Sequence, residues 1–287
     1  MTTTDPSSRS CAPVVFITGA SSGIGAAAVD VFAAAGYDVV LAARRKERLE
    51  QAAAAAAGKF PQRQFVPVVC DVAFDTSVEA AFGTVKDRFG KLDVLINNAG
   101  YGVYGSFAET SLDNFRQNME TNYFGVIRCT QAALPLLRAA AAASSRKWGA
   151  AIVMVSSIIG RRAMPTMSSY CATKFALEGL SEALRVELRD EHISVSVVNP
   201  GVTDTEFGTA AQGRRPLNFL QSQNGMSPAE AAAVLLQAVR RPRRNRYLTA
   251  AGKACVAAEW LTPRLLDYIL LKTWRQTKVQ SPGGELR

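Results

Sequence analysis

The chain has 287 residues, 48% of them hydrophobic, and a formal net charge of +9 at pH 7. This length and composition provide enough apolar surface for one large α/β domain or two small ones. No stretch approaches the roughly 18 uncharged apolar residues that a membrane span needs. Residues 1–12 lack the apolar segment of a signal peptide, so they predict a disordered leader.

The cysteines and the single histidine argue against several kinds of chemistry. The five cysteines are scattered and show no CxxC spacing, which is typical of reduced thiols in a cytoplasmic protein. The only histidine, His192, falls where a predicted helix gives way to a strand, and we interpret it as a half-exposed connector residue. A histidine-based hydrolase triad and a zinc site are therefore poorly supported, and we predict no metal.

Much of the positive charge is local, because five arginines crowd into the stretch RRPRRNR. No aromatic motif for base stacking accompanies them, and the charge is not spread along a face as in nucleic-acid-binding domains. We therefore predict no nucleic-acid partner. The five are Arg240, Arg241, Arg243, Arg244 and Arg246.

Short apolar runs alternate with helix-favouring stretches from Val14 onward. The helical stretches include Ala26–Ala35, Lys46–Ala57 and Val78–Phe89. Continuous Val/Ile runs indicate strands buried on both faces, and the alternation predicts a doubly wound parallel sheet with right-handed crossovers over residues 13–251. The expected strands begin at Val14, Asp38, Phe65, Asp93, Ala150 and Ile193.

A glycine-rich turn, TGASSGIG, follows the first predicted strand and opens a helix. Its Gly19, Gly23 and Gly25 permit a tight turn and a close approach of the backbone to a pyrophosphate, which would lie at the positive end of the helix. The position at the first strand–helix junction favours a dinucleotide site over a turn that serves packing alone.

Tyr170 and Lys174 stand four residues apart in SSYCATKFALEGL, so a helix would place them on one face. An ammonium about 5 Å from a phenol would stabilise the phenolate by roughly 3 kcal/mol, or about 2 pK units, at an effective dielectric near 20. That shift predicts a tyrosine able to do acid–base work. The same spacing recurs at Tyr268 and Lys272, so spacing alone does not identify a site.

Four motifs, in their order and spacing, resemble the short-chain dehydrogenases/reductases of the single-domain branch. They are TGASSGIG, the NNAG at Asn97–Gly100, the serine of VSS that precedes Tyr170, and NPGVTDT from Asn199. The resemblance covers about residues 14 to 248 and implies a Rossmann fold in a single domain. The second tyrosine–lysine pair lacks the upstream serine and the strand before it.

The resemblance implies catalytic roles for Asn122, Ser157, Tyr170 and Lys174. Ser157 would hold the substrate carbonyl by a hydrogen bond, and Tyr170 would deliver a proton to its oxygen. Lys174 would lower the pKa of Tyr170 and bond the nicotinamide ribose. Asn122 would hold a helix bend and a water that relays protons to Lys174.

The end of the second strand predicts the cofactor. An acidic residue there would bond the ribose hydroxyls of NAD, but Ala42 and Ala43 occupy the position and Arg44 follows. A guanidinium suits the 2′-phosphate of NADP, with Arg45 or Lys46 assisting, so we predict NADP. The cofactor contacts implied in all are Gly19, Ser21, Ser22, Gly23, Ile24, Gly25, Arg44, Asp71, Val72, Asn98, Ala99, Gly100, Tyr170, Lys174, Pro200, Gly201, Thr203 and Thr205.

The residues expected around the substrate are mostly apolar, which favours an apolar carbonyl or alcohol substrate over a sugar. The segment Glu206–Gln223 predicts a mobile lid. Two alternatives stay open: a non-catalytic NADP-binding sensor or scaffold, and a membrane-associated lipid carbonyl reductase. The predicted substrate contacts are Tyr104, Ser157, Ile159, Met164 and Phe207.

The remaining predictions concern partners. The helical regions Leu112–Ala143 and Met167–Asp190 carry more apolar surface than one sheet face covers, and by resemblance they predict a homodimer or homotetramer. Residues 252–287 form a C-terminal extension with an amphipathic helix that starts at Pro263. Its apolar face predicts docking on the domain or a partner subunit, where it would help to wall the pocket. The alternative is peripheral membrane contact over residues 240–275, where the arginines would attract anionic headgroups.

Overall fold

A parallel β-sheet lies at the centre of the computed structural model, which describes residues 12–203, 207, 212–213 and 225–279. Its strands are β1 (Val14–Thr18), β2 (Asp38–Ala43), β3 (Phe65–Val69), β4 (Val94–Asn97), β6 (Ala150–Val155), β7 (Ile193–Asn199) and β9 (Asn245–Tyr247). Their spatial order is β3-β2-β1-β4-β6-β7-β9, with every neighbouring pair parallel. The order reverses between β1 and β4, and α/β folds bind ligands beyond the carboxyl ends of the strands at such a point.

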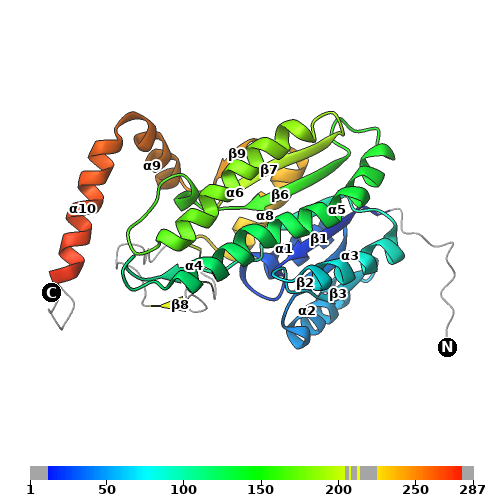
Figure 1. The fold of residues 1–287 in the computed structure, drawn as a ribbon. Helices are drawn as coiled ribbons and strands as arrows, with labels where there is room; N and C mark the ends of the chain where they lie inside the picture. The colour runs from blue at the N-terminus through cyan, green and yellow to red at the C-terminus, as the bar shows by residue number, and fades with distance from the viewer. Residues whose placement is uncertain (1–11, 204–206, 208–211, 214–224, 280–287) are drawn as a thin grey trace.

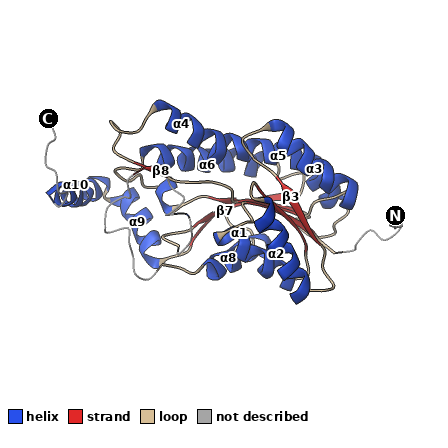
Figure 2. Cartoon of the chain, turned by 90° about the horizontal axis from the view of Figure 1, so that it is seen from below, coloured by secondary structure: helices blue, strands red, loops and turns tan. Residues whose placement is uncertain are grey.

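Helices cover both faces of the sheet (Figures 1 and 2). They are α1 (Gly23–Ala34), α2 (Lys46–Lys59), α3 (Asp75–Phe89), α4 (Leu112–Met119), α5 (Gly125–Ala142), α6 (Ser168–Glu187) and α8 (Pro228–Arg240). Figure 2 shows α1, α2 and α8 on one face and α3, α5 and α6 on the other, and the buried clusters divide in the same way. The predicted doubly wound α/β fold is confirmed.

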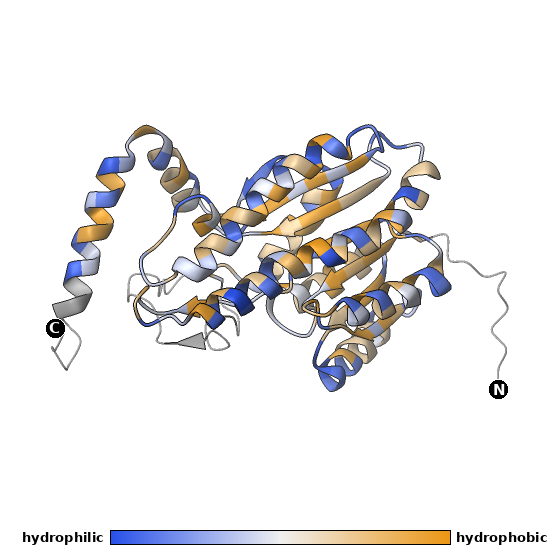
Figure 3. Cartoon of the chain, viewed as in Figure 1, coloured by the Kyte–Doolittle hydropathy of each residue, from blue (hydrophilic) through white to orange (hydrophobic). Residues whose placement is uncertain are grey.

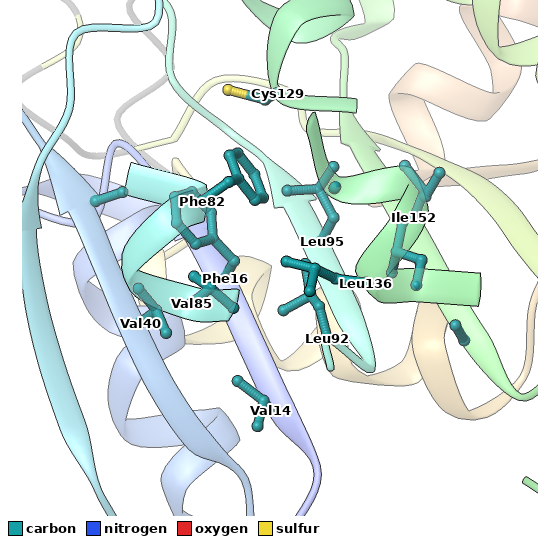
Figure 4. Packing of buried hydrophobic residues seen from close by; sticks show 14 of the residues in the cluster. Val14, Phe16, Val40, Phe82, Val85, Leu92, Leu95, Cys129, Leu136 and Ile152 are labelled. Carbon is teal, nitrogen blue, oxygen red and sulfur yellow. The ribbon is translucent and has the colours of Figure 1, made fainter. Parts of the chain in front are cut away.

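The central strand β1 shows why continuous apolar runs predicted this fold. All five of its residues are buried, and successive side chains enter opposite layers: Val14 and Phe16 join the cluster under α3 and α5, whereas Val15 and Ile17 join the one under α1 and α8. Phe16 stacks on Phe82 of α3 with ring centroids 4.5 Å apart (Figure 4).

The prediction of burial on both faces is wrong for β3. This strand is at the edge of the sheet, and only Val66 of its five residues is buried. Pro67 cannot donate a ladder hydrogen bond, which an edge strand tolerates because one of its sides has no partner strand. The apolar run at Phe65 therefore marked a strand, but only the strand order decided its exposure.

Two further helices, α9 (Ala250–Leu261) and α10 (Pro263–Val279), follow β9. We call them the C-terminal arm. The helix start at Pro263 is confirmed, and α10 points away from the sheet domain (Figure 1). Of the apolar face predicted to dock, Leu265 and Ile269 are exposed, whereas Leu266, Leu270 and Trp274 are half-buried, so this face is only partly covered within the chain. Figure 3 shows α10 as alternating polar and apolar bands.

The arginines of RRPRRNR and the arm lie at different ends of β9. The arginines run from the last residue of α8 to the start of β9, whereas α9 begins beyond the carboxyl end of that strand. The predicted contact surface over residues 240–275 is therefore not one continuous element. Among the described residues, no helix is both long and apolar enough to cross a bilayer.

Candidate active site

The glycine-rich turn adopts the backbone that its composition predicted. Gly19 and Gly23 have φ of +69° and +56°, in the left-handed region that favours glycine. A Cβ on Gly25 would lie 2.3 Å from the carbonyl oxygen of Gly19, so only glycine fits at this start of α1. The turn leaves the backbone at the helix N-terminus open to a close ligand, as a pyrophosphate requires. Ile24 packs beside it against the core.

The NNAG segment, Asn97–Gly100, is bonded to this turn. The backbone N–H groups of Asn98 and Ala99 donate to Oγ1 of Thr18 at 2.8 and 2.9 Å, and Nδ2 of Asn98 donates to the Thr18 carbonyl at 2.9 Å. The predicted ribose contact Asn98 thus also holds the ends of β1 and β4 together. Thr18 was not among the predicted site residues, although its position as the first residue of TGASSGIG could have suggested a role in the site.

Arg45 lies over the glycine-rich turn. Its guanidinium donates to Oγ of Ser21 at 3.1 Å and to Oγ of Ser22 at 2.9 Å. Arg44, the predicted phosphate ligand, is exposed directly after β2. Burial raises the pKa of Tyr101, and a hydrogen bond with Asn118 and the charge of Arg44 partly oppose that rise. The sequence named Arg44 as the phosphate ligand with Arg45 or Lys46 assisting, and of these it is Arg45 that bonds the turn.

The other predicted cofactor residues lie along the same edge. Asp71 follows β3 and accepts from the N–H of Ala73 at 3.1 Å. Val72 is buried, with its side chain against Gly125.

On the far side of the site, the Pro200 carbonyl accepts from the N–H of Ile158 at 3.2 Å, and Gly201 packs on the Ile158 side chain. Thr203 donates to the Gly201 carbonyl at 3.3 Å. Thr205 and most of the predicted lid over Glu206–Gln223 lie outside the described residues.

Tyr170 and Lys174 lie in the first two turns of α6 and are 7% and 5% exposed. The Lys174 ammonium is 5.5 Å from the centroid of the Tyr170 ring, and it donates to the Val155 carbonyl at 2.8 Å. Val155 ends β6, two residues before Ser157. The helix thus brings the pair to the carboxyl edge of the sheet, next to the predicted serine.

The predicted lowering of the tyrosine pKa is wrong for this structure. Burial raises the pKa of Tyr170, and the nearby Tyr104 and Cys171 raise it further. Burial also lowers the pKa of Lys174 to about 8, against an opposing effect of Glu178. Because the ammonium is itself destabilised by burial and bonded to a carbonyl, its attraction does not outweigh the desolvation of the phenolate.

Ser157 and Asn122 are held by local backbone irregularities. Ser157 caps the short 3₁₀ turn Ile158–Gly160, and its Oγ accepts from the N–H of Ile159 at 3.4 Å. Asn122 lies in a π-helical turn, Glu120–Phe124, that separates α4 from α5. This turn is the predicted helix bend.

The side chain of Asn122 is buried and fully engaged. Its Oδ1 accepts from the N–H of Tyr101 at 3.0 Å, and its Nδ2 donates to the Tyr101 carbonyl at 2.9 Å and to Oγ1 of Thr173 at 3.2 Å. Gly100 has the Asn122 amide against its Cα, where a Cβ would approach Oδ1 to 3.0 Å. Asn122 therefore connects the NNAG loop to α6 one residue before Lys174.

Tyr170 is part of an apolar cluster. Met167, Tyr170 and Cys171 form its buried part, and the Phe207 ring lies 5.3 Å from the Tyr170 ring between centroids. The four predicted apolar substrate contacts all pack against this cluster: Tyr104, Ile159, Met164 and Phe207. The structure thus brings together side chains that are up to 103 positions apart in the sequence, from Tyr104 to Phe207.

Sequence reasoning missed the buried carboxylate of Glu178, one turn after Lys174 on α6. Arg161 donates to it at 2.6 Å. With its amide oriented to satisfy its neighbours, Asn199 donates to Glu178 at 2.8 Å and to the Ser157 carbonyl at 2.9 Å. A glutamate four residues after the lysine was visible in the sequence, but its partners come from distant segments.

The family model for short chain dehydrogenases matches residues 13–215. This chain belongs to the short-chain dehydrogenase family. Among its relatives, dehydrogenase/reductase SDR family member 7B of Mus musculus is 36% identical over 242 residues, which cover 82% of this chain and 73% of the relative. Members of this family of dehydrogenases and reductases are oxidoreductases, and the short-chain dehydrogenase described here is one of them.

Solved structures agree with this fold. A short-chain dehydrogenase from Streptomyces avermitilis is 31% identical, covers 93% of this chain and 99% of its own, and has a TM-score of 0.77. A short-chain dehydrogenase from Sphingobium yanoikuyae, in complex with NADPH, is 27% identical, with coverages of 96% and 98% and a TM-score of 0.72.

Proposed function

We propose that this short-chain dehydrogenase interconverts a carbonyl and a secondary alcohol on a mostly apolar substrate, with NADP(H) as cofactor. The observation that carries the proposal is that Tyr170 belongs to an apolar cluster and has the Lys174 ammonium 5.5 Å from its ring, beyond the carboxyl end of β6. A phenol among apolar side chains is suited to exchange a proton with a carbonyl oxygen.

The raised pKa of Tyr170 has a consequence for the direction of proton transfer. Burial keeps the phenol protonated at neutral pH, which is the form that donates to a substrate oxygen during carbonyl reduction. The Ser157 hydroxyl would donate to the same oxygen and hold it in place. Lys174 would stabilise the phenolate left behind. When bound, the nicotinamide supplies the hydride.

The paired arginines support NADP. Arg44 is exposed at the end of β2, and Arg45 bonds the hydroxyls of Ser21 and Ser22 on the glycine-rich turn. With Ala43 in place of an acid, this corner of the site has an excess of positive charge that suits a 2′-phosphate. The solved relative from Sphingobium yanoikuyae holds NADPH.

The test is NADPH oxidation with a panel of ketones, aldehydes and 3-oxoacyl esters, ranked by kcat/KM. We expect turnover that favours apolar carbonyl compounds and exceeds turnover with NADH. A chain that binds NADPH yet turns over none of the panel would favour the alternative, a non-catalytic sensor or scaffold. That alternative has no support from the site itself, since none of Asn122, Ser157, Tyr170 and Lys174 is replaced.

We also propose that the arm makes peripheral contact with anionic membranes. Trp260 and Leu261, at the corner between α9 and α10, are 83% and 80% exposed. Three basic residues of α10 are exposed as well, namely Arg264, Lys272 and Arg275. Exposed Trp and Leu beside cations are typical of elements that bind the lipid interface, and an acyl-lipid carbonyl would then be a suitable substrate.

Flotation of the full chain with vesicles of increasing anionic lipid content tests this contact. We expect binding that rises with anionic content, falls with salt, and is lost in a Trp260→Ser, Leu261→Ser double variant. A wild-type chain that stays in the soluble fraction at low salt would remove the membrane proposal. A cytoplasmic location is proposed with or without this contact, on the scattered cysteines.

A homodimer or homotetramer is the proposed assembly. Apolar side chains are exposed on the helical regions predicted to pair, among them Leu112, Phe124, Phe175 and Val186. Light scattering at micromolar concentration should report a mass that is a multiple of 30.7 kDa. A species of 30.7 kDa alone would contradict it.

A further inference from the structure

Two consecutive arginines follow the 3₁₀ turn after Ser157, and they bind different parts of the molecule. Arg161 donates to Glu178 at 2.6 Å and to Glu182 at 3.1 Å, both on α6. Arg162 turns the other way, toward the C-terminal arm. The segment between Ser157 and Tyr170 is thus tied on one side to the helix that carries the tyrosine and on the other to the arm.

Arg162 joins both helices of the arm through one guanidinium. Its Nη1 donates to Glu259 of α9 at 2.8 Å and its Nη2 donates to Asp267 of α10 at 2.6 Å. The Arg162 side chain is 13% exposed and Glu259 is 29% exposed, whereas Asp267 is 70% exposed, so the pair with Glu259 is the one shielded from solvent. Burial works against its charge, yet the two carboxylates raise the pKa of Arg162 above its ordinary value.

The arm touches the same segment at a second place. Gly252, in the first turn of α9, lies against the Ile158 side chain so closely that a Cβ there would be 2.4 Å from Cδ1 of Ile158. Ile158 stands next to Ser157. The segment is therefore in contact with the arm immediately after Ser157 and again at Arg162.

Arg162 lies between two residues of the apolar cluster around Tyr170. Ile159 precedes it by three positions and Met164 follows it by two, and both side chains pack against Met167, Tyr170 and Cys171. By contrast, Tyr170 and Lys174 are held by α6 and by the bond to Val155. Loss of the Arg162 contacts would therefore displace Ile159 and Met164 more readily than it would displace Tyr170.

We propose that Arg162 is a positioning residue that makes the C-terminal arm part of the substrate site, by fixing the wall formed by Ile159 and Met164 from outside. The inference rests on the proposed carbonyl–alcohol activity for its kinetic consequence. The arm then sets how tightly apolar substrates bind, and it does so without contacting the reacting atoms.

The kinetic test separates KM from kcat. Arg162→Gln should raise KM for the best apolar carbonyl substrate about tenfold, which corresponds to about 1.4 kcal/mol, while kcat changes less than twofold. The double variant Glu259→Gln, Asp267→Asn removes the charges of the same pairs on the arm and should raise KM by a similar factor. Arg162→Lys, which keeps the positive charge, should restore part of the wild-type KM.

The control is Arg138→Gln. Arg138, in the last turns of α5, makes an equally short but more exposed pair with Glu191, at 2.6 Å, and has no bond to the arm. Arg138→Gln should leave both KM and kcat unchanged. An unchanged KM in Arg162→Gln and in the double variant, or a fall in kcat alone, would overturn the inference.

A second measurement does not depend on turnover. Hydrogen exchange in the full chain should be faster in Arg162→Gln than in wild type both at Ile158–Met167 and in α10, and unchanged in both regions in Arg138→Gln. Faster exchange in α10 alone would overturn the coupling. If the wild type shows no carbonyl turnover, the proposed activity fails, and the exchange result alone then decides whether Arg162 couples the arm to the wall.

Discussion

Helices α6 and α10 carry the same spacing of tyrosine and lysine in opposite surroundings. On α6, Tyr170 and Lys174 are buried between the sheet edge and an apolar cluster, and burial shifts the pKa of both groups. On α10, Tyr268 is 64% exposed on a helix that points away from the domain. The comparison shows that spacing places two side chains on one face, whereas burial decides whether they acquire unusual acid–base chemistry.

The most direct test of this difference is to remove the phenol oxygen of Tyr170 in one variant and that of Tyr268 in another. Tyr170→Phe should lower kcat by roughly a hundredfold or more, the scale of general acid catalysis, while NADPH binding stays intact. Tyr268→Phe should leave kcat unchanged. Steady-state kinetics and cofactor titration measure both, and equal activity of the two variants would show that the site is wrongly assigned.

A second prediction concerns the packing of the two helices. Leu177 of α6 is 1% exposed, so Leu177→Ala should lower the free energy of unfolding by roughly 2–5 kcal/mol through the lost contacts and the cavity left behind. Leu265→Ala on α10 should change it by less than about 0.5 kcal/mol. Denaturant unfolding gives both values. A large loss in the α10 variant would mean that another subunit covers its exposed face in solution.

A third prediction contrasts arginines in the two regions. Arg44→Ala should weaken NADPH binding by roughly 1.5–3 kcal/mol, as expected for a charge-assisted hydrogen bond, and leave NADH nearly unchanged. Arg264→Ala on α10 should affect neither cofactor.

Adding an acid with Ala43→Asp should shift the preference toward NADH. Calorimetric titration measures the affinities, and a wild-type chain that prefers NADH would contradict the assignment.

The smallest effect follows from the lowered pKa of Lys174. Below about pH 8 both states hold the proton, and the folded state bears the full cost of the buried ammonium. Above it only the unfolded chain, with its ordinary value of 10.5, holds the proton, so unfolding free energy rises with pH. The wild type should therefore gain about 1–2 kcal/mol relative to Lys174→Met between pH 8 and 9.5. Denaturant unfolding across this range checks it, and a constant difference would mean that the ammonium keeps its charge.

The sequence was enough to predict the sheet, the glycine-rich turn and the position of the tyrosine–lysine pair. Each depends on local chemistry: continuous apolar runs, glycines that readily adopt positive φ or leave room for a neighbouring backbone, and a helical repeat that brings positions i and i+4 together. The order and spacing of the four motifs also indicated the family. None of these inferences needs a contact between distant segments.

Tertiary structure decided what depends on such contacts. Whether β3 is covered, whether burial or the Lys174 ammonium controls the pKa of Tyr170, which arginine lies on the glycine-rich turn, and where Arg162 finds its carboxylates all follow from segments brought together by the fold. Desolvation is the physical reason in the case of Tyr170, because its cost depends on everything packed around the group. For Arg162 the reason is that its two partners, Glu259 and Asp267, stand about a hundred positions away in the sequence and are brought to it by the fold, which also packs α9 on Ile158.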